Sequence, residues 1–296
     1  MKKLLAAALA GVLALSLIGC GSSKEETTAA ADTTAADTTA ADTTAADTTA
    51  ADTTVADTTA AGGGVTTVVE GKLIVGTEAG FAPYEYLVGD QVAGVDMDIV
   101  QAIADKMGLE LEIQNMDFDG ALIAVQQGKV DLVAAGVSVD ETRAKVMDFS
   151  TNYVDSTEVI VVNAAAPAVT ESSGDALADK TVGVQQGNIA DLWVSNPENA
   201  APGEIMRYTK FAQASEDLKN GKIDCIVMDE LPAKELVESS GGTLVILEGE
   251  PLFIDQYAIA VQKGNDQLLA VINEVIKDLQ DSGRMDEIIA SHSTAQ

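Results

Sequence analysis

The sequence predicts an α/β protein in which short strands alternate with helices. After residue 64, apolar runs rich in Val and Ile alternate with segments whose apolar residues recur at helical spacing. This pattern is typical of largely parallel sheets flanked by helices. It extends over about 230 residues, enough for two α/β lobes. Residues 1–66 lack it, so the fold is expected to begin near residue 68.

Residues 1–20 have the pattern of an export signal. Two lysines precede an apolar run over residues 4–18, which is shorter than the roughly 20 apolar residues that a membrane span needs. A basic start before such a run is typical of a secretory signal peptide. The run ends in Leu-Ile-Gly-Cys20, which resembles the lipobox of bacterial lipoproteins. We therefore expect a lipid on Cys20 that anchors the chain outside the cytoplasm, on the cell membrane.

Residues 21–66 have the composition of a tether. They consist mainly of Ala, Thr, Asp, Ser and Gly, with an Ala-Asp-Thr-Thr-Ala unit that recurs every five residues between Asp32 and Asp57. A period of five matches neither a helix nor a strand, and the segment has nothing apolar to bury. It is expected to be disordered.

The folded part is expected to contain eight main strands. Their ranges are 72–76, 109–113, 130–134, 158–162, 181–184, 204–208, 223–227 and 243–247. Helices are expected between them, for example where Ile99, Ile103 and Met107 share one face and where Gly128 ends an apolar run. Residues 265–289 carry one apolar stripe and are predicted to form a single helix.

The composition excludes several classes of function. A formal net charge of −30 repels phosphate backbones, so nucleic-acid binding is not expected. His292 is the one histidine, which excludes most histidine-based triads and zinc sites. Cys225 lies in an apolar run without a base to activate it, and is expected to be core. Asp96 and Asp98 lack the spacing of a calcium loop. No metal and no cofactor is expected.

Arg143 is the first candidate for ligand binding. Its planar guanidinium can donate two parallel hydrogen bonds to a carboxylate. It follows a predicted strand that ends near Gly136, and ligands of open α/β sheets bind at the carboxyl ends of strands. Ser138 adds a hydroxyl in the same loop. A lone arginine at a helix start is more often a solvated surface residue, so the spacing alone leaves both alternatives open.

These residues belong to a longer ordered pattern. Its motifs are GTEAGFAPYE (76–85), GVDMDIV (94–100), AGVSVDETR (135–143), MDFSTNY (147–153), VGVQQG (182–187), DCIVMD (224–229) and QYAIA (256–260). In this order, over residues 70–292, the chain resembles the extracytoplasmic solute-binding proteins of polar amino-acid ABC transporters, solute-binding protein family 3. The lipobox makes it similar to their lipoprotein form.

The resemblance implies a two-lobed periplasmic-binding-protein fold of type II, with a mostly parallel sheet in each lobe. The chain would cross twice between the lobes, at hinges near 153–157 and 253–257. Lobe 1 would then combine residues 68–154 with 256–296, and lobe 2 would hold residues 155–255. A monomer is expected, with lobes that close on the ligand.

The resemblance also implies roles for individual residues. Phe81 would stack on the ligand side chain, with Phe118 as the second wall, and Glu78 would face its distal group. A phenylalanine in either place is, taken alone, more often part of a core. Arg143 would clamp the α-carboxylate, and Asp229 would receive the α-ammonium. Asp229 could equally cap the next helix.

Backbone and hydroxyl groups complete the expected site. Gly136 and Ser138 match positions that contact the ligand. Gln186, Asn188 and Ile189 lie where the backbone N–H groups of the family assist the carboxylate. Asn188-Ile189 replaces the usual Thr or Ser, so a hydroxyl is lost here, and Gln185 stands where some relatives carry a lysine that faces the ligand.

The resemblance therefore implies a receptor that is not an enzyme. It would bind a polar or basic L-amino acid, with lysine, arginine, ornithine, histidine and glutamine as candidates, and deliver it to an ABC permease driven by a cytoplasmic ATPase. Two alternatives stay open at this point. One is a dehydratase that acts on a cyclic carboxylic acid, because one fold hosts many functions. The other is an amino-acid sensor without transport.

Overall fold

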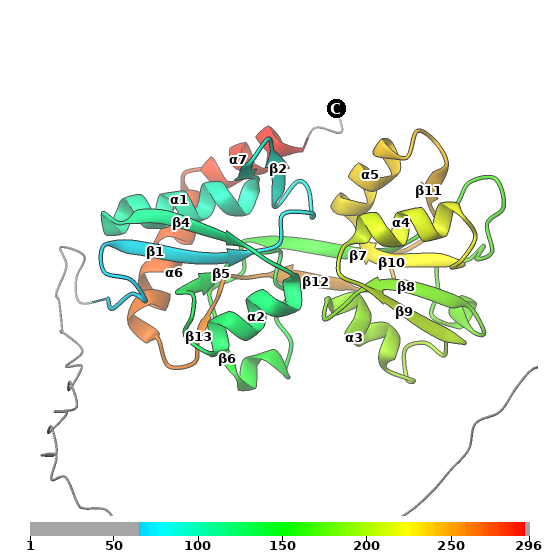
Figure 1. Ribbon diagram of the computed structural model, residues 1–296, viewed down its shortest axis with the longest axis horizontal. Coiled ribbons are helices and arrows are strands. Elements are labelled where there is room, and N and C mark those ends of the chain that lie inside the picture. Colours follow the sequence, from blue (N-terminus) through cyan, green and yellow to red (C-terminus); the bar gives the residue numbers. More distant parts are fainter. Residues whose placement is uncertain (1–64, 294–296) are drawn as a thin grey trace, which may run out of the picture. The chain divides into compact units, whose positions relative to one another are not determined.

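A computed structural model describes residues 65–293 of the chain (Figure 1). These residues lie within one of the two structural units of the chain. The predicted export signal, its Cys20 and almost all of the predicted tether lie outside the described residues. Within the described residues, no helix combines the length and the apolar character that a membrane span requires.

The first sheet contains five strands in the order β4-β1-β5-β13-β6. Its strands are β1 (Lys72–Thr77), β4 (Glu110–Asn115), β5 (Leu132–Val133), β6 (Met147–Phe149) and β13 (Ala260–Gln262). β1 pairs in parallel with β4 and β5, whereas β13 is antiparallel to β5 and β6. Its helices are α1 (Val95–Met107), α2 (Phe118–Gln126), α6 (Asp266–Asp281) and α7 (Arg284–His292). We call this sheet and its helices lobe 1.

The second sheet has the strand order β11-β7-β10-β8-β9, with β12 paired to β7. Its strands are β7 (Val154–Asn163), β8 (Thr181–Gln185), β9 (Glu204–Tyr208), β10 (Cys225–Asp229), β11 (Leu244–Ile246) and β12 (Ile254–Tyr257). The pairs β10–β8 and β8–β9 are parallel, and β7 is antiparallel to its neighbours. Its helices are α3 (Ile189–Ser195), α4 (Phe211–Lys219) and α5 (Glu230–Ser239). We call this part lobe 2.

The sequence-based fold class is confirmed: the chain is α/β, with two sheets flanked by helices. Each of the eight expected strands is present, with ends that differ by a few residues. Cys225 lies in β10 and is fully buried, and burial raises the pKa of its thiol to about 12. It is therefore a core residue, as expected.

The prediction of one helix over 265–289 is wrong. α6 ends at Asp281, and α7 begins at Arg284. Between them Gly283 has a φ of 74°, a left-handed conformation that glycine adopts without the steric cost of a Cβ atom and that ends helices. The apolar stripe continues into α7 at Met285 and Ile288, so the periodicity concealed the break.

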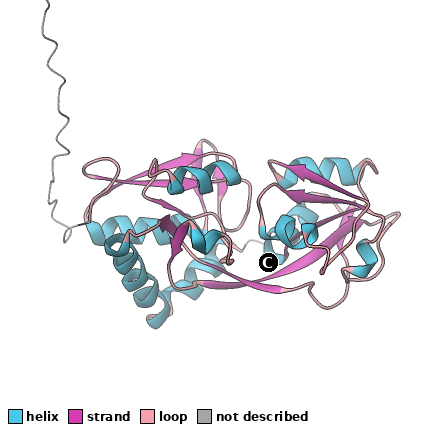
Figure 2. Ribbon diagram, turned by 90° about the horizontal axis from the view of Figure 1, so that it is seen from below, coloured by secondary structure: helices cyan, strands magenta, loops and turns pink. Residues whose placement is uncertain are grey.

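Two paired strands connect the lobes. β7 and β12 run antiparallel, with Val154 opposite Tyr257 and Thr157 opposite Ile254. The pair bridges the lobes, and β7 continues into the sheet of lobe 2 (Figures 1 and 2). The crossings therefore occur in the segments where the hinges are predicted, and movement about them stays a prediction.

One apolar core runs through both lobes. It joins the inner face of α1 and residues such as Phe81 in lobe 1 to Phe211 and Ile226 in lobe 2. Tyr153 and Tyr257, at the two crossings, belong to the same cluster. The short hairpin of β2 (Tyr86–Val88) and β3 (Gln91–Ala93) lies next to α1. The loops that carry the predicted site residues emerge around this shared core.

Candidate functional site

The loop after β1 brings Glu78 and Phe81 to the boundary between the lobes. Glu78 is 1% exposed. A Cβ atom at Gly80 would lie 2.8 Å from its Oε1, so the glycine leaves room for the carboxylate to fold back over the loop. Phe81 is also buried, and its ring stacks on Tyr84 at 5.9 Å and on Phe211 of lobe 2 at 6.1 Å. Phe81 therefore contacts lobe 2 through Phe211, and Glu78 contacts it through Lys210.

Gly136 supports the ring of Phe81. Its φ is 54°, and a Cβ atom there would lie 2.8 Å from a ring carbon of Phe81. Its N–H donates to Asp96 at 2.9 Å, and the Tyr153 hydroxyl donates to the same carboxylate at 2.7 Å. Burial raises the pKa of Asp96 to about 6. Asp96 therefore fixes the loop around Gly136 from within α1.

Arg143 is buried although it carries a charge. It opens a single 3-10 turn, Arg143–Lys145, and is 6% exposed. Its Nη1 donates to the Ser138 carbonyl at 2.6 Å, and its Nη2 donates to the Gly187 carbonyl of lobe 2 at 2.7 Å. Asp140 pairs with Nε at 3.2 Å. Burial lowers the pKa of Arg143, against the charges of neighbouring carboxylates.

Phe118 forms a wall beside this guanidinium. It is the first residue of α2, is 4% exposed, and has its ring centroid 5.6 Å from Cζ of Arg143. At this distance the positive charge is attracted to the ring face. A small cavity of about 130 Å³ opens here between the lobes. Its lining comprises Asp117, Phe118, Asp119, Gly120, Gln186 and Thr209.

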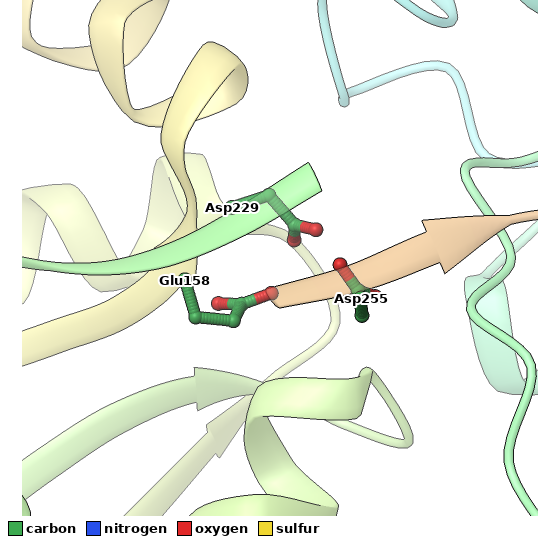
Figure 3. A group of neighbouring side chains, drawn as sticks. All are labelled: Glu158, Asp229 and Asp255. Atoms are coloured by element: carbon green, nitrogen blue, oxygen red, sulfur yellow. The ribbon is translucent and has the colours of Figure 1, made fainter. Parts of the chain in front are cut away.

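Asp229 belongs to a cluster of three carboxyl groups with Glu158 and Asp255. One oxygen of each lies within 4.8 Å of the others, and Figure 3 shows the groups directed toward one another from three strands. Asp229 accepts hydrogen bonds from the hydroxyl of Ser156 at 3.3 Å and from that of Tyr257. Its Oδ2 and both oxygens of Glu158 have no partner among the described residues apart from the cluster itself.

The cluster concentrates negative charge where water is excluded. Asp229 and Glu158 are fully buried. Burial raises the pKa of both, and the charge of Asp229 adds to the rise at Glu158. Burial and the charge of Asp229 likewise raise the pKa of Asp255 to about 6. Since like charges at this separation repel, the cluster favours a cation in its vicinity.

The turn after β8 uses most of its backbone N–H groups within lobe 2. The N–H groups of Gln186 and Asn188 donate to the carbonyls of Tyr208 and Gln185 at 2.8 and 3.1 Å, so the prediction that they assist a ligand carboxylate is not met in this arrangement. Asn188 caps α3, because its Oδ1 accepts the N–H of Ala190 at 2.8 Å. Ile189 begins the helix and borders a second, open cavity of about 870 Å³. The side chain of Gln186 is exposed and reaches Asp119 of lobe 1 only at 3.5 Å.

The structure thus brings the predicted residues of both lobes to one boundary. Glu78, Phe81 and Arg143 of lobe 1 each contact lobe 2 directly. The charge of Asp229 acts on the guanidinium of Arg143 and partly opposes the lowering of its pKa by burial. Gln186 is the most peripheral member of the set.

The sequence interpretation missed several residues of the site. Lys210 pairs with Glu78, but nothing in its local sequence indicates this. Glu158 and Asp255 flank Asp229 because the register of β7 with β10 and β12 places them there. For Asp255, the sequence offers one indication of a role in the site: it directly precedes the QYAIA motif.

Comparisons with known proteins agree with the resemblance that the ordered motifs indicate. The family model "Bacterial extracellular solute-binding proteins, family 3" matches residues 73–294. L-cystine-binding protein TcyJ of Escherichia coli K12 is 29% identical over 216 residues, which cover 73% of this chain and 80% of TcyJ. Arginine-binding extracellular protein ArtP of Bacillus subtilis is 30% identical over 221 residues, 73% of this chain and 84% of ArtP.

Solved structures give the same result. Holo ArgBP from T. maritima is 36% identical, with a TM-score of 0.66 over 71% of this chain and 91% of ArgBP. AbpA from Streptococcus pneumoniae, bound to L-arginine, is 35% identical, with a TM-score of 0.68 over 76% of this chain and 95% of AbpA. These relatives are binding proteins and not enzymes, so the dehydratase alternative is set aside.

Proposed function

The chain belongs to the bacterial extracellular solute-binding proteins of family 3, and from that premise we propose that it captures a polar or basic L-amino acid between its lobes for an ABC permease. In this proposal Arg143 binds the α-carboxylate and Asp229 the α-ammonium, while Phe81 and Phe118 flank the side chain. Gly136, Ser138 and the backbone N–H of Ile189 complete the contacts, whereas the N–H groups of Gln186 and Asn188 are already bonded to carbonyls of lobe 2.

One observation carries the proposal: a buried guanidinium lies near a buried cluster of acids. Within residues 65–293, the Nη donors of Arg143 are bonded to two backbone carbonyls, and Oδ2 of Asp229 has no partner there apart from the acidic cluster. A zwitterion supplies a carboxylate for the first group and an ammonium for the second. Charge-assisted hydrogen bonds to both would offset the desolvation of groups that are costly to bury.

The names of the relatives support a polar or basic ligand. ArtP and AbpA are described with arginine, and TcyJ is named for L-cystine. Each of these ligands is an amino acid with a long polar side chain. The buried aromatic rings of Phe81 and Phe118 match such a side chain, since flat rings provide apolar walls on either side of its stem.

We further propose that the ligand closes the lobes about the β7–β12 pair, and that a lipid on Cys20 holds the receptor at the membrane. The contact between Arg143 and the Gly187 carbonyl joins the lobes, which supports a closed arrangement. A Cys20→Ala variant should appear in the soluble fraction of cells. Its retention with the membranes would argue against the anchor.

Native mass spectrometry of the protein purified from cells tests the proposed function. We expect an added mass equal to one amino acid, which acid extraction and chromatography would then identify. Arg143→Lys, which keeps the charge but loses the planar fork, should carry less of it. The proposal would be contradicted if neither protein carried an amino acid and neither bound an amino acid added later.

A further inference from the structure

Both oxygens of Glu78 are bonded to lobe 2. Its Oε1 lies 2.8 Å from Nζ of Lys210. Its Oε2 accepts a hydrogen bond from Nε2 of Gln185 at 3.0 Å, and that amide also donates to the Thr209 carbonyl at 3.0 Å. A carboxylate at the end of β1 in lobe 1 is thus held by the end of β8 and by the residue that precedes α4.

This contact can form only while the lobes are closed. Glu78 comes from lobe 1, whereas Lys210 and Gln185 come from lobe 2, and no covalent connection near the contact fixes their separation. The side chain of Glu78 is 2% exposed in this arrangement. If the lobes separate, its carboxylate becomes hydrated and the ion pair with Lys210 breaks. Lys210 therefore contributes a positive charge to this subsite in the closed form and withdraws it in the open form.

The ion pair changes what the subsite can recognise. A free carboxylate at Glu78 would attract a cationic side chain. With Lys210 in place, the pair sums to zero charge, and an incoming ammonium or guanidinium would lie beside the ammonium of Lys210. Because the side chain of Glu78 is almost fully buried here, water screens the repulsion between two positive charges beside it only in part. A neutral amide or other uncharged polar group encounters no such repulsion.

We infer that Lys210 is a specificity-determining residue, which through its ion pair with Glu78 directs the closed receptor toward amino acids with uncharged polar side chains and away from arginine and lysine. The inference rests on the proposed function and narrows it, because it selects among the polar and basic ligands that the fold admits.

Exchange of Lys210 for methionine tests the inference. The Lys210→Met side chain retains much of the length but has no charge, and its position is 39% exposed, so folding should be preserved. Lys222→Met is the matched control, because Lys222 pairs with Asp217 on the surface at 2.7 Å. Calorimetric titration with glutamine and with arginine, on protein refolded to remove bound ligand, gives the ratio of the two dissociation constants for each variant.

We expect the wild type and Lys222→Met to bind glutamine more tightly than arginine. Lys210→Met should shift the ratio at least tenfold toward arginine, and added salt should reduce the shift. Glu78→Gln, which leaves Lys210 unpaired, should move the ratio the opposite way. An unchanged ratio in Lys210→Met, or a wild type that prefers arginine, would overturn the inference while leaving the proposed function intact. Binding of no amino acid by any variant would overturn both.

Discussion

Replacement of Asp229 by asparagine should separate stability from binding. The three carboxyl groups approach within 4.8 Å, where two full charges repel by about 3.5 kcal/mol at an effective dielectric constant of about 20. Because burial raises the pKa of all three groups, protonation already relieves part of this repulsion. The Asp229→Asn side chain keeps Oδ1 as the acceptor for Ser156 and Tyr257, and its Nδ2 would become a donor to the remaining acids.

The ligand-free Asp229→Asn protein should therefore be more stable than the wild type, by about 1–2 kcal/mol, which is the part of the repulsion that protonation leaves. For a fold of this size, 1 kcal/mol corresponds to about 2–4 °C in the melting temperature. Differential scanning calorimetry at pH 7.5 measures the shift. In contrast, binding of the cognate amino acid should be lost, because the ammonium loses its charged partner.

Glu158→Gln is the control for this experiment. It relieves the same repulsion within the cluster but leaves the proposed ammonium acceptor in place. We expect similar stabilisation and affinity within about tenfold of the wild type, a difference of about 1.4 kcal/mol. An Asp229→Asn protein that melts below the wild type, or that binds the amino acid unchanged, would refute the account of the cluster.

Three further predictions concern single features of the site. Arg143→Lys should weaken amino-acid binding by about 2 kcal/mol or more in calorimetric titrations, because the bidentate fork is lost; retained affinity would remove the carboxylate assignment. Phe81→Ala should lower the free energy of unfolding by about 3–5 kcal/mol in urea melts, because it leaves a cavity beside Phe211. It should also weaken amino-acid binding by about 1–3 kcal/mol. A loss of stability without a loss of affinity would assign the ring to the core alone. Acidification from pH 7.5 to about 4.5 should raise the melting temperature of the ligand-free protein. Burial raises the pKa of Asp96 and of Asp255 to about 6, so the folded state binds more protons in this pH range than the unfolded state does. A melting temperature that falls on acidification would contradict this assignment.

Much of the fold could be predicted because its longer strands are buried runs of β-branched residues. β1 and β10, for example, are almost entirely buried. Some strands of three or four residues, such as β6 and β12, were not predicted. Too few residues alternate in them to give a periodic pattern, and they are held by antiparallel pairing with segments distant in the sequence.

The candidate site could be predicted only in part, for a similar reason. Ordered motifs indicate Arg143 and Asp229, because each lies within a recognisable run of residues. The acid at Glu158 and the ammonium at Lys210 enter the site through strand register and through contact between lobes, neither of which has a local signature. The capping role of Asn188 was likewise not anticipated, although asparagine is a favoured residue at helix starts.

Binding of an amino acid at the boundary between the lobes is the core of the proposed function. Its most direct test is a thermal-shift panel on the purified protein, refolded to remove bound ligand, against the common amino acids with ornithine and cystine. A ligand at about 1,000 times its dissociation constant stabilises the folded state by about 4 kcal/mol. We expect a concentration-dependent rise with one or a few polar amino acids, and a rise in Arg143→Lys at the same concentrations that is smaller by about half or more. A panel without any shift, or a shift that Arg143→Lys retains in full, would contradict the account.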